Sequence, residues 1–149
     1  MTSTTAEGKV EPKKDIVAIL AAHRVPYIAT ISLAHLDDAA RKMSHALDGR
    51  GFRFVHLLAP CPTGWKSEPS DTIELVRQAV RSGIYPVLEV LDGETWVINV
   101  EPELSSPALE RYLALQGRFR LARGDVTELR ADVARQWKRL RKLAAPSDR

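Results

Sequence analysis

The segment FRFVHLLAPCPTGWKSEPSDTIELVRQAVRSG, residues 52–83, decides the fold class of this chain. It begins with a run of apolar and β-branched residues, which is typical of a buried strand. Proline and glycine then interrupt the run around the only cysteine, Cys61. After this break, Ile73, Val76 and Val80 recur at helical spacing, and Gly83 is placed to end the helix. The segment therefore predicts a strand, a connecting loop and a helix.

The residues before this segment repeat the same pattern. Residues 13–23 predict a helix, and Val25 to Ile31 predict a short strand. A second helix follows, and its predicted apolar face consists of Leu36, Ala39, Ala40, Met43 and Leu47. Alternating helices and strands predict an α/β fold with parallel strands and right-handed crossovers. Because the first element is a helix with no preceding strand, we expect the C-terminal half of a doubly wound, mostly parallel sheet.

The residues after the segment predict a hairpin and a terminal helix. Val87 to Leu91 and Thr95 to Val100 are β-rich runs joined by the turn DGE, so we expect a hairpin at the edge of the sheet. Two acidic pairs have the spacing of a capping box, namely Asp71 with Glu74 and Asp125 with Glu128. The second pair precedes an amphipathic helix whose predicted apolar face consists of Val126, Leu129, Val133, Trp137 and Leu140.

Length and charge indicate one domain with a basic tail. The chain has 149 residues, enough for one hydrophobic core. We divide it into a flexible lead-in over 1–12, a partial α/β domain over 13–117 and a basic helical extension over 118–149. The extension holds ten Lys or Arg residues against four Asp or Glu. With neither a signal sequence nor an apolar run of membrane-spanning length, we expect a cytoplasmic protein that does not bind membranes.

The common catalytic motifs are missing, which leaves Cys61 as the main candidate. The sequence contains no GxGxxG, P-loop, HExxH or CxxC motif. We interpret His56 as a core residue, whereas His35 follows a predicted strand and keeps a possible functional role. A lone cysteine is usually a small buried hydrophobe. However, Cys61 follows a strand and stands between two prolines, and a rigidly presented thiol suits either a metal ligand or a nucleophile.

The stretches VPYIATISLAHLDDAARKM, residues 25–43, and FRFVHLLAPCPTGWKSEPSDTIELVRQAVRSGIYPVLEVLDGE, residues 52–94, carry a family resemblance. They resemble the C-terminal part of the β subunit of pyruvate:ferredoxin oxidoreductase, also called pyruvate synthase, and of the related 2-oxoisovalerate enzyme. The resemblance extends from about Thr2 to Asp92. It implies a thiamine-diphosphate-binding-type α/β domain. It also implies oxidative decarboxylation of a 2-oxoacid to an acyl-CoA, with electrons passed through a four-iron four-sulfur cluster to ferredoxin.

The same resemblance implies a role for Cys61 and a need for partners. Cys61 matches one of four cysteine ligands of the cluster, in a loop shaped by Pro60, Pro62, Thr63 and Gly64. The other family motifs, which are three further cysteines, a GDG motif and an Asn-containing loop for Mg and the diphosphate, do not occur here. We therefore expect the isolated chain to bind neither thiamine diphosphate nor a complete cluster. It would act with an N-terminal β fragment and other oxidoreductase subunits, as a split subunit or as a truncated product.

Two other interpretations remain open. The chain could be a non-catalytic assembly module or a relic of that subunit, with its basic helix serving assembly. Nucleic-acid binding by residues 118–142 is a weaker alternative, because the only aromatic residues there are Phe119 and Trp137, and Trp137 belongs to the predicted apolar face. We therefore do not expect nucleic acid as a partner. Pyruvate is the first candidate substrate, and branched 2-oxoacids remain open.

Overall fold

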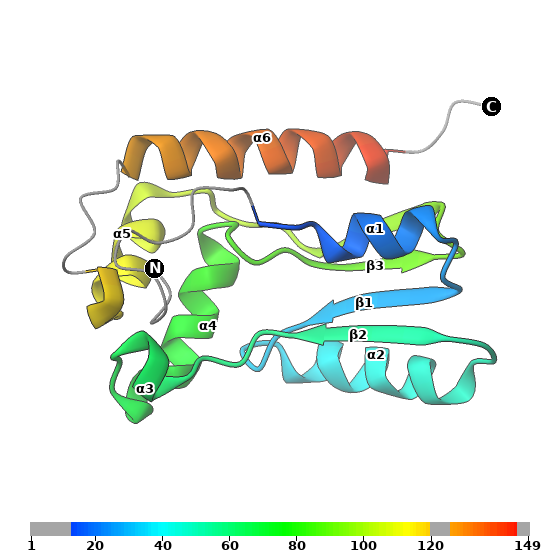
Figure 1. Cartoon of the computed structure of the whole chain (residues 1–149), viewed down its shortest axis with the longest axis horizontal. Coiled ribbons are helices and arrows are strands. Elements are labelled where there is room, and N and C mark those ends of the chain that lie inside the picture. The colour runs from blue at the N-terminus through cyan, green and yellow to red at the C-terminus, as the bar shows by residue number, and fades with distance from the viewer. Residues whose placement is uncertain (1–12, 120–125, 146–149) are drawn as a thin grey trace.

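The computed structural model describes residues 13–119 and 126–145, which form a four-stranded sheet with helices on both faces (Figure 1). The elements, in chain order, are α1 (Ile16–Ala22), β1 (Tyr27–Ile31), α2 (Leu36–Asp48), β2 (Arg53–Leu57), α3 (Pro62–Trp65), η1 (Pro69–Asp71), α4 (Thr72–Arg81), β3 (Val87–Leu91), β4 (Thr95–Val100), α5 (Ser106–Ala114), η2 (Gly117–Phe119) and α6 (Val126–Ala144). The predicted α/β class and the C-terminal helix are confirmed. The predicted lead-in, residues 1–12, lies outside the described residues.

The sheet is mixed, so the prediction of mostly parallel strands is wrong. The strand order is β2-β1-β3-β4, and only β1 and β2 are parallel, with Tyr27 opposite Arg53 and Ile31 opposite Leu57. β3 is antiparallel to both of its neighbours. Figure 1 shows the reason, since α4 lies beyond the carboxyl ends of β1 and β2 and does not cross back along the sheet. The chain therefore enters β3 at that same end and runs in the opposite direction.

The predicted hairpin is confirmed with its predicted bounds. β3 and β4 pair from Leu91 opposite Thr95 down to Val87 opposite Val100, and β4 forms one edge of the sheet. Asp92 and Gly93 in the connecting turn both have positive φ, as tight hairpin turns require. The residues DGE therefore form the hairpin turn that the sequence predicts.

One face of the sheet is covered by α1 and α6. Buried residues from α1, β1, β3, α6 and the connection before β1 form one apolar cluster, namely Val17, Ala21, Val25, Ile28, Leu88, Val90, Val133, Trp137 and Leu140. Trp137 is almost fully buried, and its indole N–H donates to the Gly83 carbonyl oxygen at 2.8 Å. Gly83 has a φ of +81° and ends α4 as predicted. The basic extension therefore contains a core helix, as its apolar pattern predicts.

The apolar face predicted for α2 is largely wrong, because Ala39 is its only buried member. Leu36, Met43 and Leu47 are exposed, at 65%, 40% and 73%, whereas the buried residues of α2 are Ala39, Lys42 and Ala46. Ala46 packs on Tyr27 and Ala29 of β1, on the sheet face opposite α1 and α6. The fully buried Lys42 lies on this face, where its ammonium donates to the Thr30 carbonyl oxygen of β1, a contact that the hydrophobic pattern does not reveal.

Other parts of the prediction differ in local detail. Asp71 makes no side-chain cap hydrogen bond to α4, while Asp125 of the second predicted capping box lies outside the described residues. Helix α5 was not predicted, and it packs against α4 through Tyr112. None of the helices within residues 13–119 and 126–145 combines the length and apolar character needed to cross a bilayer.

Candidate functional site

Cys61 lies at the start of the short helix α3, beyond the carboxyl end of β2 (Figure 1). Its side chain is exposed, so the usual interpretation of a lone cysteine as a buried hydrophobe does not hold. Cys61 is the N-cap of α3, where its Sγ accepts a hydrogen bond from the Gly64 backbone N–H at 3.3 Å. The thiol is therefore both accessible and oriented by the backbone.

The residues around Cys61 form one turn of helix rather than the irregular loop we expected. Pro62 is the first residue of α3, a position that proline favours because its missing N–H has no partner there. Thr63 and Gly64 follow within the turn and are exposed, while Pro60 before it is partly buried. The turn ends at Lys66, which adopts the left-handed conformation with a φ of 52°. All four predicted loop residues therefore flank or form the turn that presents Cys61.

This arrangement fits one thiolate ligand of a metal cluster. An exposed sulfur that accepts a backbone N–H matches the hydrogen bonding that stabilises cluster thiolates and tunes their potential. A complete site needs about four such ligands. Within the described parts of the chain, no three His, Cys, Asp or Glu side chains are grouped closely enough to hold a metal ion. The residues present therefore fit one corner of a cluster site.

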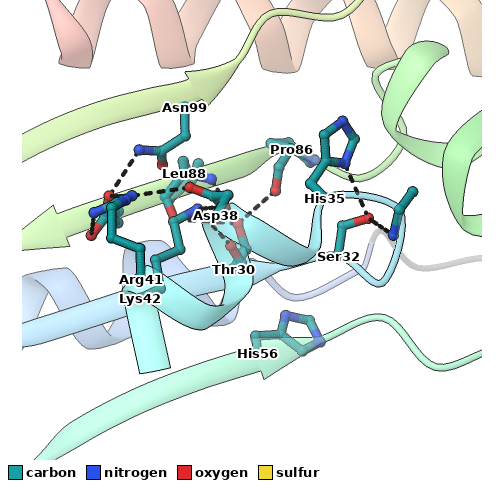
Figure 2. A network of polar contacts seen from close by, with 12 residues as sticks. Thr30, Ser32, His35, Asp38, Arg41, Lys42, His56, Pro86, Leu88 and Asn99 are labelled. Carbon is teal, nitrogen blue, oxygen red and sulfur yellow. Dashed lines mark hydrogen bonds and ion pairs between the residues drawn. The ribbon is translucent and has the colours of Figure 1, made fainter. Parts of the chain in front are cut away.

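The two histidines of interest lie near the carboxyl ends of β1 and β2 (Figure 2). His56 is in β2, partly buried, with its ring edge-on to Tyr85 at 5.7 Å between centroids. Burial, with a smaller contribution from the charge of Lys13, lowers the pKa of His56. His56 is thus a half-buried residue of an edge strand rather than the core residue we predicted.

His35 is the N-cap residue of α2, in the loop that follows β1. Its ring Nδ1 lies 3.4 Å from the Ser32 Oγ, and that hydroxyl also accepts from the Ala34 N–H at 3.2 Å. Figure 2 shows His35 and Ser32 on the same loop, with His56 on the neighbouring strand. The contacts of His35 therefore shape the loop itself.

A network of buried charges, not predicted from the sequence, joins α2 to the sheet (Figure 2). Lys42 is fully buried, and its Nζ donates to the Thr30 carbonyl oxygen at 3.0 Å and pairs with Asp38 Oδ2 at 2.6 Å. Burial lowers the pKa of Lys42, and the contact with Asp38 opposes that shift. Thr30 also fastens β1 to β3, since its hydroxyl donates to the Pro86 carbonyl oxygen at 2.6 Å and accepts from the Leu88 N–H at 2.8 Å.

Glu89 is the second centre of this network. It is 6% exposed and accepts hydrogen bonds from Tyr27 Oη at 2.7 Å, from Asn99 Nδ2 at 2.8 Å and from two nitrogens of Arg41 at 2.5 and 3.2 Å. Burial alone would raise the pKa of Glu89, but these hydrogen bonds outweigh it and lower the pKa to about 2. Burial and the bond to Glu89 raise the pKa of Tyr27. The charged groups are paired within the protein, whereas Asn99 Oδ1 is buried without a hydrogen-bond partner among the described residues. The paired charges stabilise the fold.

The sequence contains a partial signal for this network. Asp38 and Lys42 have the i, i+4 spacing of a helical ion pair, which usually marks a solvated face. Glu89 interrupts the apolar strand VLEVL, and a buried carboxylate of that kind needs partners. The partners of Glu89 come from β1, α2 and β4, and their identity follows only from the pairing of the strands and the packing of α2 on the sheet.

The fold and the site define a class: a mixed α/β domain that presents one exposed, backbone-oriented cysteine beyond the ends of two parallel strands. No family model matches the chain. It is 39% identical over 133 residues to the ketoisovalerate oxidoreductase subunit VorB of Pyrococcus abyssi, covering 89% of this chain and 43% of that subunit. It is 42% identical over 113 residues to the pyruvate synthase subunit PorB of Methanocaldococcus jannaschii, covering 76% of this chain and 37% of that subunit.

The pyruvate synthase subunit PorB of Pyrococcus furiosus is 36% identical, over 92% of this chain and 49% of that subunit. These homologues are β subunits of 2-oxoacid:ferredoxin oxidoreductases, so the predicted relationship of the chain to that family is confirmed. The chain spans less than half the length of each of these three relatives.

Proposed function

We propose that this chain is one part of the β subunit of a 2-oxoacid:ferredoxin oxidoreductase, with pyruvate as the first candidate substrate. The reaction is the oxidative decarboxylation of the 2-oxoacid to an acyl-CoA, with electrons delivered to ferredoxin. The proposal is supported by identities of 36–42% that extend over 76–92% of the chain. Thiamine diphosphate and Mg belong, in this proposal, to the part of the subunit that carries the motifs missing here. The partners are that N-terminal part of the β subunit and the other subunits, with ferredoxin and coenzyme A acting through the complex.

We further propose that Cys61 supplies one of four thiolate ligands in the assembled complex. The observation that carries this assignment is an exposed Sγ held at the N-cap of α3 by the Gly64 N–H. When bound, a four-iron four-sulfur cluster supplies single-electron transfer. The residues of this chain orient the sulfur: Pro62 fixes the first turn, and the Gly64 N–H offsets negative charge on the thiolate.

The test is Cys61→Ser in the assembled oxidoreductase, obtained by coexpressing the chain with the missing part of the subunit. Serine is a good N-cap residue, so this change keeps α3 while it removes the sulfur. We expect a fall in iron content and loss of the cluster's electron paramagnetic resonance signal, with assembly unchanged. Ser70→Ala, at an exposed position of η1, is the matched control. A variant complex with full iron content and an unchanged spectrum would refute the ligand assignment.

A second candidate function is a non-catalytic assembly module. It is favoured by the exposed apolar side chains of Leu36, Met43 and Leu47 on α2 and by β2, which has a neighbouring strand on only one side in the described sheet. Exposed apolar side chains at a sheet edge are typical of surfaces that another chain covers. A complex that assembles normally and keeps its cluster in the Cys61→Ser variant would support this alternative.

A further inference from the structure

The turn that presents Cys61 cannot be stable by itself. Helix α3 has four residues, far fewer than the about 12–15 that an isolated helix needs in water. A few backbone hydrogen bonds close it. The Trp65 N–H donates to the Cys61 carbonyl oxygen at 2.8 Å, and the N–H groups of Lys66 and Ser67 both donate to the Pro62 carbonyl oxygen, from Ser67 at 3.1 Å. The direction of the Cys61 side chain therefore depends on what holds this turn from outside.

A backbone contact from a distant part of the chain holds the end of the turn. The Gly117 N–H, in η2, donates to the Lys66 carbonyl oxygen at 2.9 Å. The approach is so close that a Cβ on Gly117 would lie 2.8 Å from that oxygen and 2.9 Å from the Lys66 Cβ. Only glycine fits there without a shift of the backbone. Residue 117 is thereby tied to the residue that caps α3.

A stack of side chains reinforces this contact. The Arg118 guanidinium carbon lies 4.0 Å from the centre of the Trp65 ring, well within the range of a cation–π interaction. Trp65 also meets Tyr112 edge-on at 6.4 Å between ring centroids. Arg118 and Tyr112 come from η2 and α5, so the last residue of α3 is held by two separate elements.

The stack is itself anchored in the core. Gln116 is fully buried; its amide donates to the Tyr112 carbonyl oxygen at 2.6 Å, and its Oε1 accepts from Arg118 Nε at 2.9 Å. Tyr112 packs with Leu75, Ala79 and Val80 of α4. A continuous path of contacts therefore runs from the core through α5 and η2 to α3.

We propose that Arg118 and Gly117 are positioning residues, which hold the α3 turn through Trp65 and Lys66 and so orient the Cys61 thiolate toward its cluster. This proposal rests on the proposed function of Cys61. It assigns a role to a segment beyond Asp92, where the sequence resemblance assigns none. Neither residue contacts the cluster in this proposal; both act through the turn that carries the ligand.

The first measurement is amide hydrogen exchange in the assembled oxidoreductase, which reports on the turn and not on catalysis. Arg118→Ala and Trp65→Leu should each speed exchange at the Trp65, Ser67 and Gly117 amides by about 3- to 30-fold, the range that a cation–π contact implies. Because the two side chains share one contact, the increase in the double variant should be smaller than the product of the two single increases. Gly117→Ala should also speed exchange at these amides, although it removes no side chain of the stack. Arg111→Ala is the matched control, since Arg111 pairs with Glu74 of α4 and should leave these amides unchanged.

The second measurement tests whether the turn positions the ligand. Arg118→Ala should shift the midpoint potential and the electron paramagnetic resonance spectrum of the cluster and speed its loss to a chelator, whereas Arg118→Lys should restore part of both. Unchanged exchange in Arg118→Ala, or faster exchange with an unaltered potential and spectrum, would overturn the positioning role. Those results leave the Cys61 assignment intact. Full iron content in Cys61→Ser would instead overturn the proposed function, and the exchange data would still report on the contact between η2 and α3.

Discussion

Replacing Glu89 with glutamine tests the buried charge network directly. Glu89→Gln keeps the size of the side chain and removes its charge. The pKa of Glu89 is about 2 in the folded chain, against 4.5 for an unperturbed glutamate. A folded pKa below the unfolded one means that the ionised carboxylate stabilises the fold above pH 4.5. That stabilisation is lost as the pH falls toward 2. At about 1.4 kcal/mol per pKa unit, it amounts to about 3 kcal/mol at pH 7 and about 1.5 kcal/mol at pH 3.

The assay is urea unfolding followed by tryptophan fluorescence at several pH values from 7 down to 3. Glu89→Gln should lower the free energy of unfolding by about 3 kcal/mol at pH 7, and by about half of that at pH 3. Glu94→Gln is the control, because Glu94 is exposed in its pair with Arg24 and its loss should cost less than about 0.5 kcal/mol. A deficit for Glu89→Gln that is equally large at pH 3 and pH 7 would show that the carboxylate's charge is not what stabilises the network.

Two further substitutions test the packing that positions the site. Gly83→Ala should destabilise the chain by more than about 2 kcal/mol, because φ is +81° and a Cβ would lie 2.5 Å from Trp137 Nε1; Gly49→Ala, where a Cβ meets only ordinary contacts, should be nearly neutral in the same thermal melt. Lys42→Met should lower the free energy of unfolding by about 3 kcal/mol, since Asp38 loses its buried partner. Adding Asp38→Asn should recover part of that loss in urea unfolding, and no recovery would contradict the pairing.

The spacing of apolar residues and the turn residues predicted those elements that depend only on a short stretch of sequence. The hairpin from Val87 to Val100 and the core helix around Trp137 are where the pattern placed them. Helix α5 escaped prediction, and the orientation of α2 was predicted wrongly. In both cases tertiary contacts override a local pattern. Helix α5 is stabilised by packing on α4, and α2 faces the sheet with Ala39, Lys42 and Ala46.

The candidate site divides in the same way. Cys61 and its prolines could be identified from the sequence because an isolated thiol between two rigid residues is unusual. Trp65 was part of the quoted motif, but Arg118 lies 53 positions further along the chain and had no visible connection to it. Contacts between residues that far apart leave no periodic trace in a single sequence.

The sequence by itself determined the α/β class, the hairpin, the terminal helix and the position of the single cysteine. These features depend on local properties of the chain. Asp92 and Gly93 accept the positive φ of a tight turn, and the apolar residues of α6 recur at helical spacing. Only the tertiary structure decided that β3 runs antiparallel to β1, that Lys42 and Glu89 are buried, and that η2 supports the turn at Cys61. Each of these depends on how α2, α4 and α5 pack against distant parts of the chain, and the spacing of residues along the sequence does not record that packing.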